Sequence, residues 1–253
     1  PASPGGVALG DGEEDSPDSG NAPRPDVVWD SDPAAPIVSG TFCCGFTSEL
    51  VPINYIPDFQ VWGDGRIVWV EYDESGGRRV LEAQFSANEL SAVLQQAVDA
   101  GFFGWKERYE NLTITDMADK CLTINLVSDS KTVCEYFEGA PQEFHNLYDL
   151  LARGAGLDGD DYVPESGYLV AHVLAEFTLS PISEDDVIWP ADTLFSLQEA
   201  VDKGIWVEEE ALELAWEAVN KDPWGVVVRE GGSTAYQLSV QIPGLNMTPP
   251  PER

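Results

Sequence analysis

The stretch Val61-Trp62-Gly63-Asp64-Gly65-Arg66-Ile67 carries the strongest local signal of the chain, an Asp-Gly pair between two apolar runs. Asp and Gly tolerate the positive φ angles of a two-residue turn, so this stretch predicts a β-hairpin centred on Asp64-Gly65. Pairing about that centre forms one apolar face from Phe59, Val61, Val68 and Val70. The opposite face then carries Gln60, Trp62, Ile67 and Trp69.

The tryptophans of this second face give the sequence its first candidate binding surface. Trp62 and Trp69, together with Gln60, are expected to contact a protein partner or a ligand, because aromatic platforms bind sugars and proteins. The alternative is that they pack beneath a second layer, such as another domain.

Segments downstream of the hairpin alternate between helical and strand patterns. Ser86-Ala87-Asn88-Glu89 matches a capping box, so a helix is expected to begin there and to end near Gly101. Pro141 begins a second expected helix, which ends near Gly154. Between the two helices, Cys121–Val127 and Lys131–Phe137 alternate as hairpin strands around a turn at Asp129-Ser130. This register places Leu122, Ile124, Leu126, Val133 and Phe137 on the core face.

The second half of the chain has a similar order. It predicts a strand at Tyr168–Phe177, a helix at Glu208–Asn220 and a hairpin that turns at Gly231-Gly232. The fold class is therefore expected to be α+β, with two small disulfide-stapled units of antiparallel sheet covered by helices. The expected divisions are a flexible tether at 1–36, an α+β domain at 37–156, a linker at 157–166, a smaller α+β domain at 167–248 and a tail at 249–253.

The four cysteines, Cys43, Cys44, Cys121 and Cys134, are even in number. The chain begins at Pro1, which is expected of a processed protein or of part of a longer gene product, and disulfides in an oxidising compartment are favoured. In the expected hairpin, Cys121 and Cys134 lie about four positions apart at ~3.4 Å per residue, too far for a bond. We therefore favour bridges from Cys43 and Cys44 to Cys121 and Cys134. A bond between Cys43 and Cys44, a zinc site and reduced thiols remain the alternatives.

The charge of the chain excludes several partners. Its 45 acidic and 13 basic side chains give a formal net charge of −32, which repels phosphate backbones and anionic lipid heads. We therefore expect neither nucleic-acid binding nor binding to a membrane surface. No apolar run approaches the ~20 residues of a transmembrane helix, and 43% hydrophobic residues indicate a globular protein.

Several of these segments together resemble a known group of proteins. The run PDFQVWGDGRIVW at 57–69, the helix ending in AGFF at 100–103, the cysteine-containing hairpin and EYFEGAPQEFHNLYDLL at 135–151 resemble an uncharacterised family of secreted bacterial proteins, often lipoproteins. The resemblance covers about residues 36–155, and the segment from Trp224 to Gly232 is similar to the end of longer members. It implies export to the cell envelope and an α+β fold, and it brings no catalytic residues.

Candidate chemistry is sparse. His145 and His172 are the only histidines, and neither lies near a nucleophile in a legible triad pattern, so structural roles are expected. Asp158, Asp160 and Asp161 in a Gly-rich loop offer oxygen ligands for a possible Ca²⁺ ion, although their spacing is not that of an EF-hand, and no other cofactor is expected. The leading hypothesis is a non-catalytic interaction or accessory protein of the cell envelope, secreted or anchored at the cell surface, with a protein partner. The alternative is an extracellular carboxylate-based hydrolase that acts on glycans.

Overall fold

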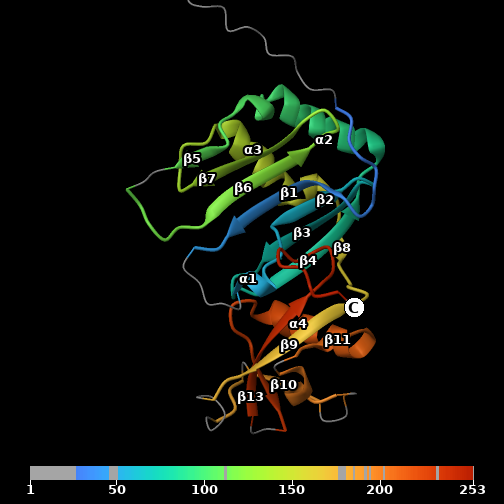
Figure 1. Cartoon of the computed structure of the whole chain (residues 1–253), viewed down its shortest axis with the longest axis vertical. Coiled ribbons are helices and arrows are strands. Elements are labelled where there is room, and N and C mark those ends of the chain that lie inside the picture. Colours follow the sequence, from blue (N-terminus) through green and yellow to red (C-terminus); the bar gives the residue numbers. More distant parts are fainter. Residues whose placement is uncertain are drawn as a thin grey trace, which may run out of the picture.

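The computed structural model describes residues 27–252, except for 46–50, 111–112, 176–180, 185, 191–192, 194, 202 and 232–233. Residues 1–26, which make up most of the expected tether, lie outside the described residues. Within the described part, two β-sheets with helices form two units stacked along the long axis of the molecule (Figure 1). The expected α+β fold class is confirmed.

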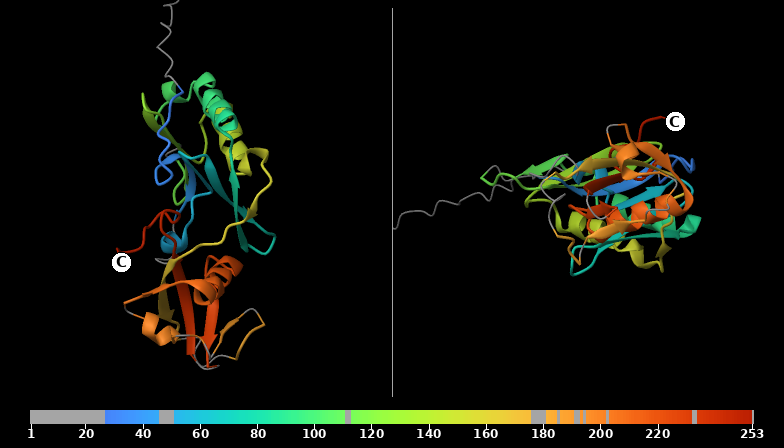
Figure 2. Two further views of the ribbon diagram at one scale, coloured as in Figure 1. Left: turned by 90° about the vertical axis from the view of Figure 1, so that its right-hand side faces the viewer. Right: turned by 90° about the horizontal axis from the view of Figure 1, so that it is seen from below.

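The first unit contains an eight-stranded sheet with the strand order β5-β7-β6-β1-β2-β3-β4-β8. Only β5 and β7 are parallel neighbours in it. A short helix α1 (Val51–Asn54) precedes β2, while α2 (Ala87–Asp99) and α3 (Gln142–Leu151) lie on one face of the sheet (Figure 2). The strands are β1 (Pro36–Cys43), β2 (Phe59–Trp62), β3 (Arg66–Tyr72), β4 (Arg78–Gln84), β5 (Arg108–Glu110), β6 (Asp119–Asn125), β7 (Ser130–Tyr136) and β8 (Asp160–Asp161).

The second unit contains a five-stranded sheet with the order β10-β12-β13-β9-β11 and a single longer helix, α4 (Glu209–Lys221). Here β10 and β12 are parallel, and the other neighbours are antiparallel. Its strands are β9 (Gly167–Val173), β10 (Val187–Trp189), β11 (Ile205–Val207), β12 (Val227–Glu230) and β13 (Thr234–Gln241). Short 3₁₀ turns occur at Phe102–Gly104, Gly154–Gly156 and Leu197–Ala200.

The helix signals in the sequence are confirmed. At the start of α2, the Ser86 hydroxyl accepts a bond from the Glu89 amide, and the Glu89 carboxylate accepts one from the Ser86 amide. This reciprocal pair satisfies two backbone donors that a helix start otherwise leaves without partners. The apolar stripes of α2 and α3 then pack on the sheet and complete the first core, with Leu90, Leu94, Phe144, Leu147 and Leu151 buried.

The last part of the expected tether is packed against this core. Val27 and Trp29 contact the first core, and the Trp29 indole nitrogen donates to the Gly63 carbonyl at 3.0 Å. The packed part of the chain therefore includes residues before the expected boundary at residue 36, because these two apolar side chains bury surface against the first core.

The first hairpin has a different register from the expected one. Val61 pairs with Ile67, and Phe59 pairs with Trp69, because three residues rather than two form the loop. The Gly65 amide bonds to the Trp62 carbonyl, and Gly65 takes a φ of 92°, which suits the third residue of such a loop. A shift of one residue moves every side chain of a strand to the other face. Phe59, Val61, Ile67 and Trp69 therefore share the helix-covered core, and Gln60, Trp62, Val68 and Val70 face the other way.

The outward face of β2, β3 and β4 is covered by the second unit. Trp62, Val68, Val70 and Val80 belong to one core cluster together with residues of α4, β9, β12 and β13. Polar groups reinforce this contact: the Asn54 amide donates to the Leu238 carbonyl and accepts from the Val240 amide, both at 3.0 Å. The segment after β13 returns beside α1 (Figure 2), where the Met247 amide donates to the Tyr55 carbonyl at 3.1 Å.

Candidate functional site: the strand-end surface of the first sheet

The tryptophan face expected from the sequence does not exist as a surface. Trp62 and Trp69 lie on opposite faces of the sheet, and each is only 2% exposed. Gln60 is also buried, and its side-chain amide donates to the Leu245 carbonyl at 2.7 Å. Trp62 and Gln60 lie under the second unit, which was the alternative expectation, while Trp69 packs beneath the helix side. None of the three is available to a partner.

The expected cysteine pairing is also wrong. Cys121 and Cys134 are direct cross-strand partners on β6 and β7 and form a disulfide with their Cα atoms 4.1 Å apart. Cys43 and Cys44 are bonded to each other, which the sequence left as an alternative. The error arises from the turn, which spans Leu126–Asp129 and shifts the partner of Cys121 by four positions. Two disulfides are therefore present, with a connectivity that leaves no thiol in the described chain.

Asp158, Asp160 and Asp161, the expected Ca²⁺ ligands, lie at or beside the short strand β8. Asp160 and Asp161 form strand β8, which pairs with β4 at the sheet edge, and the Asp161 carboxylate accepts a bond from Arg79 at 2.6 Å. Adjacent residues of a strand point to opposite faces, so the expected oxygen ligands diverge. In the described ranges, no group of three or more His, Cys, Asp or Glu side chains has the arrangement of a metal site. His172 lies on β9, and His145 of α3 lies 3.4 Å from the buried Glu135 carboxylate.

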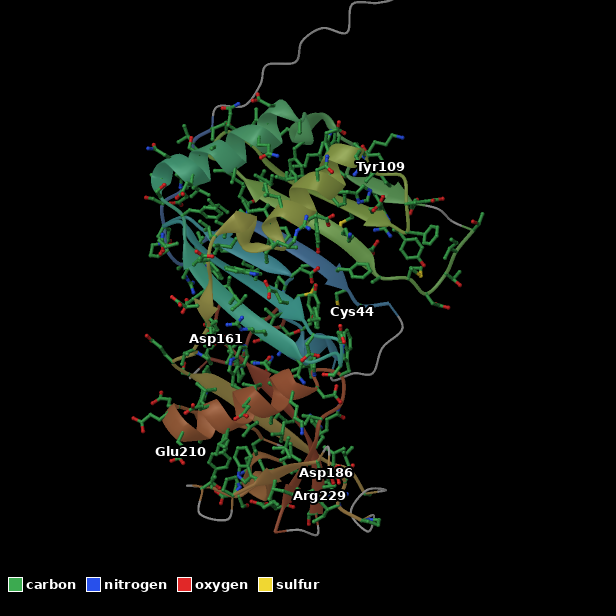
Figure 3. All side chains as sticks on the ribbon, turned by 180° about the vertical axis from the view of Figure 1, so that it is seen from behind. Cys44, Tyr109, Asp161, Asp186, Glu210 and Arg229 are labelled. Atoms are coloured by element: carbon green, nitrogen blue, oxygen red, sulfur yellow. A yellow bond between two sulfur atoms is a disulfide. The ribbon has the colours of Figure 1, made fainter. Side chains whose placement is uncertain are left out.

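A different surface gathers where β1 and β7 end and β6 begins. We call it the strand-end surface and define it as Phe42, Cys43, Cys44, Met117, Tyr136 and Phe137. The register brings these segments together, because Cys43 pairs with Asp119, which in turn pairs with Tyr136. The Tyr136 hydroxyl accepts a bond from the Met117 amide at 3.1 Å. Figure 3 shows Cys44 at this end of the sheet, with Tyr109 of the edge strand β5 farther along it.

Three large apolar side chains of this surface are open to solvent. Phe42 is 49% exposed, Met117 39% and Phe137 46%. Single exposed hydrophobic residues are normal, but three on adjoining strand ends make this a candidate contact area. The sequence placed Phe137 in the core, because it continues the alternation of β7; in the structure it follows the strand with a φ of 76° and turns outward.

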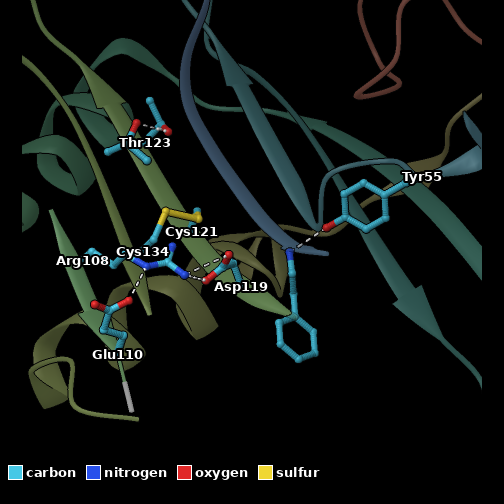
Figure 4. Close-up of a disulfide and its surroundings, with 9 residues drawn as sticks. Tyr55, Arg108, Glu110, Asp119, Cys121, Thr123 and Cys134 are labelled. Carbon is cyan, nitrogen blue, oxygen red and sulfur yellow. Dashed lines mark hydrogen bonds and ion pairs between the residues drawn. A yellow bond between two sulfur atoms is a disulfide. The ribbon is translucent and has the colours of Figure 1, made fainter. Parts of the chain in front are cut away.

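A buried polar cluster of Tyr55, Asp58 and Tyr148 holds the Phe42 part of this surface in place. The Tyr55 hydroxyl accepts a bond from the Phe42 amide at 2.6 Å, drawn in Figure 4, and donates to Asp58 at 3.1 Å. Tyr148 of α3 donates to the other Asp58 oxygen at 2.7 Å. The Lys120 ammonium lies 4.9 Å from the centre of the Tyr148 ring. The backbone of Phe42 is therefore tied through two tyrosines to helix α3.

Burial and the mutual interactions of this cluster shift the pKa values of its members. Burial raises the pKa of Asp58 above its ordinary value, although hydrogen bonds from Tyr148 and Tyr55 and the charge of Lys120 act in the opposite direction. Burial, followed by the charge of Asp58, raises the pKa of Tyr55 and of Tyr148, so both phenols stay protonated and donate. Both oxygens of Asp58 are engaged by these donors, which suits a structural role.

The rim of the strand-end surface is mostly acidic. Asp116 and Glu138 are exposed beside it in the chain, and the exposed Glu110 pairs with Tyr136 across β5 and β7. Arg108 is neutralised by two carboxylates, at 3.0 Å from Glu110 and 3.0 Å from Asp119 (Figure 4). An apolar centre with an acidic rim is suited to binding a surface that is apolar and basic. No residue pattern in the sequence predicts this site, because it forms only when three strand ends are brought together.

Comparisons with known proteins give this chain no relative: no protein-family model, no curated protein and no solved structure matches it. Across the described residues, no helix combines the length and the apolar character that a membrane crossing requires.

Proposed function

We propose that this protein is a non-catalytic extracytoplasmic interaction protein, an accessory component of a bacterial cell envelope that binds a basic partner protein through the strand-end surface. The observation that carries the proposal is the trio of exposed apolar side chains, Phe42, Met117 and Phe137, at adjoining strand ends, where the Phe42 amide is held by the Tyr55 hydroxyl. Rigid apolar anchors lose little conformational entropy on binding, and such anchors dominate interface energetics.

The disulfides support the proposed compartment. Cys43–Cys44 and Cys121–Cys134 are both oxidised, and disulfides persist mainly outside the reducing cytoplasm. The resemblance of residues 36–155 to secreted bacterial proteins supports the same location. The net charge of −32 supports a basic partner, since long-range attraction accelerates the encounter of oppositely charged proteins.

Site-specific photocrosslinking in the native envelope tests this proposal. A photoreactive amino acid at Met117 or Phe137 is expected to give the same discrete adduct, and one at Val127 is expected to give none. Val127 is the matched control, because it is 70% exposed at the opposite end of the same hairpin. The adduct yield should fall as salt is raised, because salt screens attraction between exposed charges. Equal adducts from Val127, or an adduct with a second copy of this chain alone, would contradict the proposal.

Glycan hydrolysis is the second candidate, and the raised pKa of Asp58 is the observation that favours it. A carboxyl group whose pKa is raised by burial is the starting point for a general acid. The Asp58→Asn variant tests this second candidate. It should abolish any release of reducing sugar from envelope glycans if Asp58 is the acid, and release that persists in the variant would exclude Asp58 from that role.

A further inference from the structure

A second site lies between the two units. The β3–β4 hairpin and helix α4 enclose a cleft of about 450 Å³, and α4 lies directly beneath this end of the first sheet in Figure 1. Residues of both units line the cleft: Tyr72, Arg78 and Arg79 come from the hairpin, and Glu217, Asn220 and Lys221 come from α4. A molecule bound there would contact both units at once. The cleft is separate from the strand-end surface, so the inference does not depend on the proposed function.

Arg78 is the unusual member of this cleft. It is only 7% exposed, and its hydrogen-bond partners among the described residues are neutral: Nε donates to the Asn220 side-chain oxygen at 2.6 Å, and Nη1 donates to the Asn54 carbonyl at 2.8 Å. No ion pair between described residues includes Arg78. A buried cation without a counter-ion is costly, and burial lowers the pKa of Arg78 to about 10, with nearby Tyr72 acting in the opposite direction.

The bonds of Arg78 determine what its remaining donors can bind. A guanidinium has five N–H groups, and the Asn220 and Asn54 bonds hold two of them. The outer edge formed by Nη1 and Nη2 is left to donate two parallel bonds, which is the arrangement that matches a carboxylate. The guanidinium carbon Cζ of Arg78 lies over the Trp216 ring, 5.7 Å from the ring centre, and this contact restricts the orientation of the guanidinium.

The other charges of the cleft limit the ligand further. Arg78, Arg79 and Lys221 give three positive groups, and Glu71, Asp73 and Glu217 give three negative ones, so the lining is neutral in a chain of net charge −32. Three of the 13 basic residues of the chain thus gather at one cleft. A multiply charged anion would be repelled by the carboxylates and by the whole protein. A molecule that carries both a carboxylate and an ammonium group meets an opposite charge for each.

The acidic side of the cleft has one accessible carboxylate on α4. Asp73 is engaged in its own turn, where it accepts bonds from the Ser75 amide at 2.8 Å and the Gly77 amide at 2.9 Å. Glu217 is exposed on α4, one helical turn before Lys221. Glu217 is therefore the carboxylate best placed to receive an ammonium group.

We propose that the cleft between the β3–β4 hairpin and α4 is a binding site for a small zwitterion of the amino-acid class, whose carboxylate is held by the outer edge of the Arg78 guanidinium and whose ammonium group lies toward Glu217.

Calorimetric titration of the full chain with individual L-amino acids tests this site. Binding of at least one amino acid is expected. The corresponding amine, which lacks the carboxylate, and the N-acetylated amino acid, which lacks the ammonium, should each bind at least about tenfold more weakly. Inorganic phosphate is the third comparison and should not bind. Heat from phosphate alone, or no heat from any amino acid, would overturn the proposal.

Variants then locate the site. Arg78→Lys keeps the charge but loses the bidentate edge, and about tenfold weaker binding or more is expected. Because Arg78 also joins the units, Glu217→Gln provides a second variant on an exposed helix position; it should weaken binding of the amino acid but not of its N-acetyl form. Glu213→Gln is the matched control, since Glu213 is exposed one turn earlier on α4 and does not line the cleft. Unchanged affinity in Glu217→Gln and in folded Arg78→Lys would refute the assignment.

Discussion

Removing the Cys121–Cys134 disulfide should destabilise the protein far more than removing Cys43–Cys44. The two bonds differ in the length of chain that they close. Cys121 and Cys134 are 13 residues apart, whereas Cys43 and Cys44 are adjacent. A cross-link stabilises a fold mainly by restricting the unfolded chain, and the restriction grows with the loop that it closes.

The loop length gives the magnitude. A loop of about 15 residues corresponds to about 3 kcal/mol of stabilisation at 25 °C. For a chain of this size each kcal/mol shifts the melting temperature by about 2–4 °C, so the Cys121→Ser/Cys134→Ser variant should melt about 6–12 °C lower. The Cys43–Cys44 disulfide restricts only one peptide unit of the unfolded chain. Removing it in the Cys43→Ser/Cys44→Ser variant should therefore change the melting temperature much less.

Urea unfolding followed by tryptophan fluorescence, without reductant, measures both variants on the same scale. Buried Trp62 and Trp69 report on the two faces of the first sheet. Equal losses in the two variants would refute the argument from loop length. A cross-linked peptide joining Cys43 or Cys44 to Cys121 or Cys134, found by mass spectrometry of the native protein, would refute the connectivity itself.

Two further predictions concern the cores. Arg229 and Asp186 form a buried ion pair at 2.7 Å. Arg229→Met should lower the free energy of unfolding in urea by about 3–5 kcal/mol, because it leaves the Asp186 carboxylate buried without that guanidinium. Adding Asp186→Asn to the same chain should restore part of this free energy. Burial raises the pKa of Asp186, but the hydrogen bond and charge of Arg229 outweigh burial and hold that pKa below its ordinary value. The stabilisation by this ion pair is therefore complete above the unfolded pKa near 3.9 and is lost as pH falls through the lower folded value. If the urea midpoint of the wild type falls no more below pH 4 than that of the Asp186→Asn/Arg229→Met variant, this pH dependence is contradicted. Gly40→Ala should lower the free energy of unfolding by about 1–3 kcal/mol or more, because a Cβ there would lie 2.2 Å from the Phe59 ring. A Cβ at Gly104 meets no atom within 4 Å, so Gly104→Ala should be nearly neutral. Similar melting temperatures for these two variants would show that the Phe59 ring moves aside.

The sequence predicts element types well where one residue pattern decides them. The α2 cap depends on Ser86 and Glu89 alone, and the α4 helix was expected within one residue of its bounds. The short strands β10 and β11 have three residues each and were missed, since their pairing partners lie elsewhere in the chain. Strand β4 was missed as well, although its partner β3 is the preceding strand.

The predicted register is wrong in both hairpins of the first sheet, and the two errors have different consequences. In the first, the loop is one residue longer than expected, an odd shift, so Trp62 and Trp69 were assigned to one face and actually lie on two. In the second, the shift is four, an even number, so Leu122, Ile124 and Val133 remained in the core as expected. The same error nevertheless moved Cys134 opposite Cys121. Parity therefore decides whether a register error changes the faces or only the partners.

The division of the outward face of the first sheet explains where the cleft beside Arg78 lies. On its outward face, β1, β6 and β7 present Thr41, Thr123 and Thr132, which water can solvate. The outward side chains of β2, β3 and β4, Trp62, Val68, Val70 and Val80, are apolar and require cover, which the second unit supplies. The units therefore depend on each other, and the cover ends where Arg78 meets Asn220. Arg78 is buried at that border, where its guanidinium also donates to the Asn54 carbonyl.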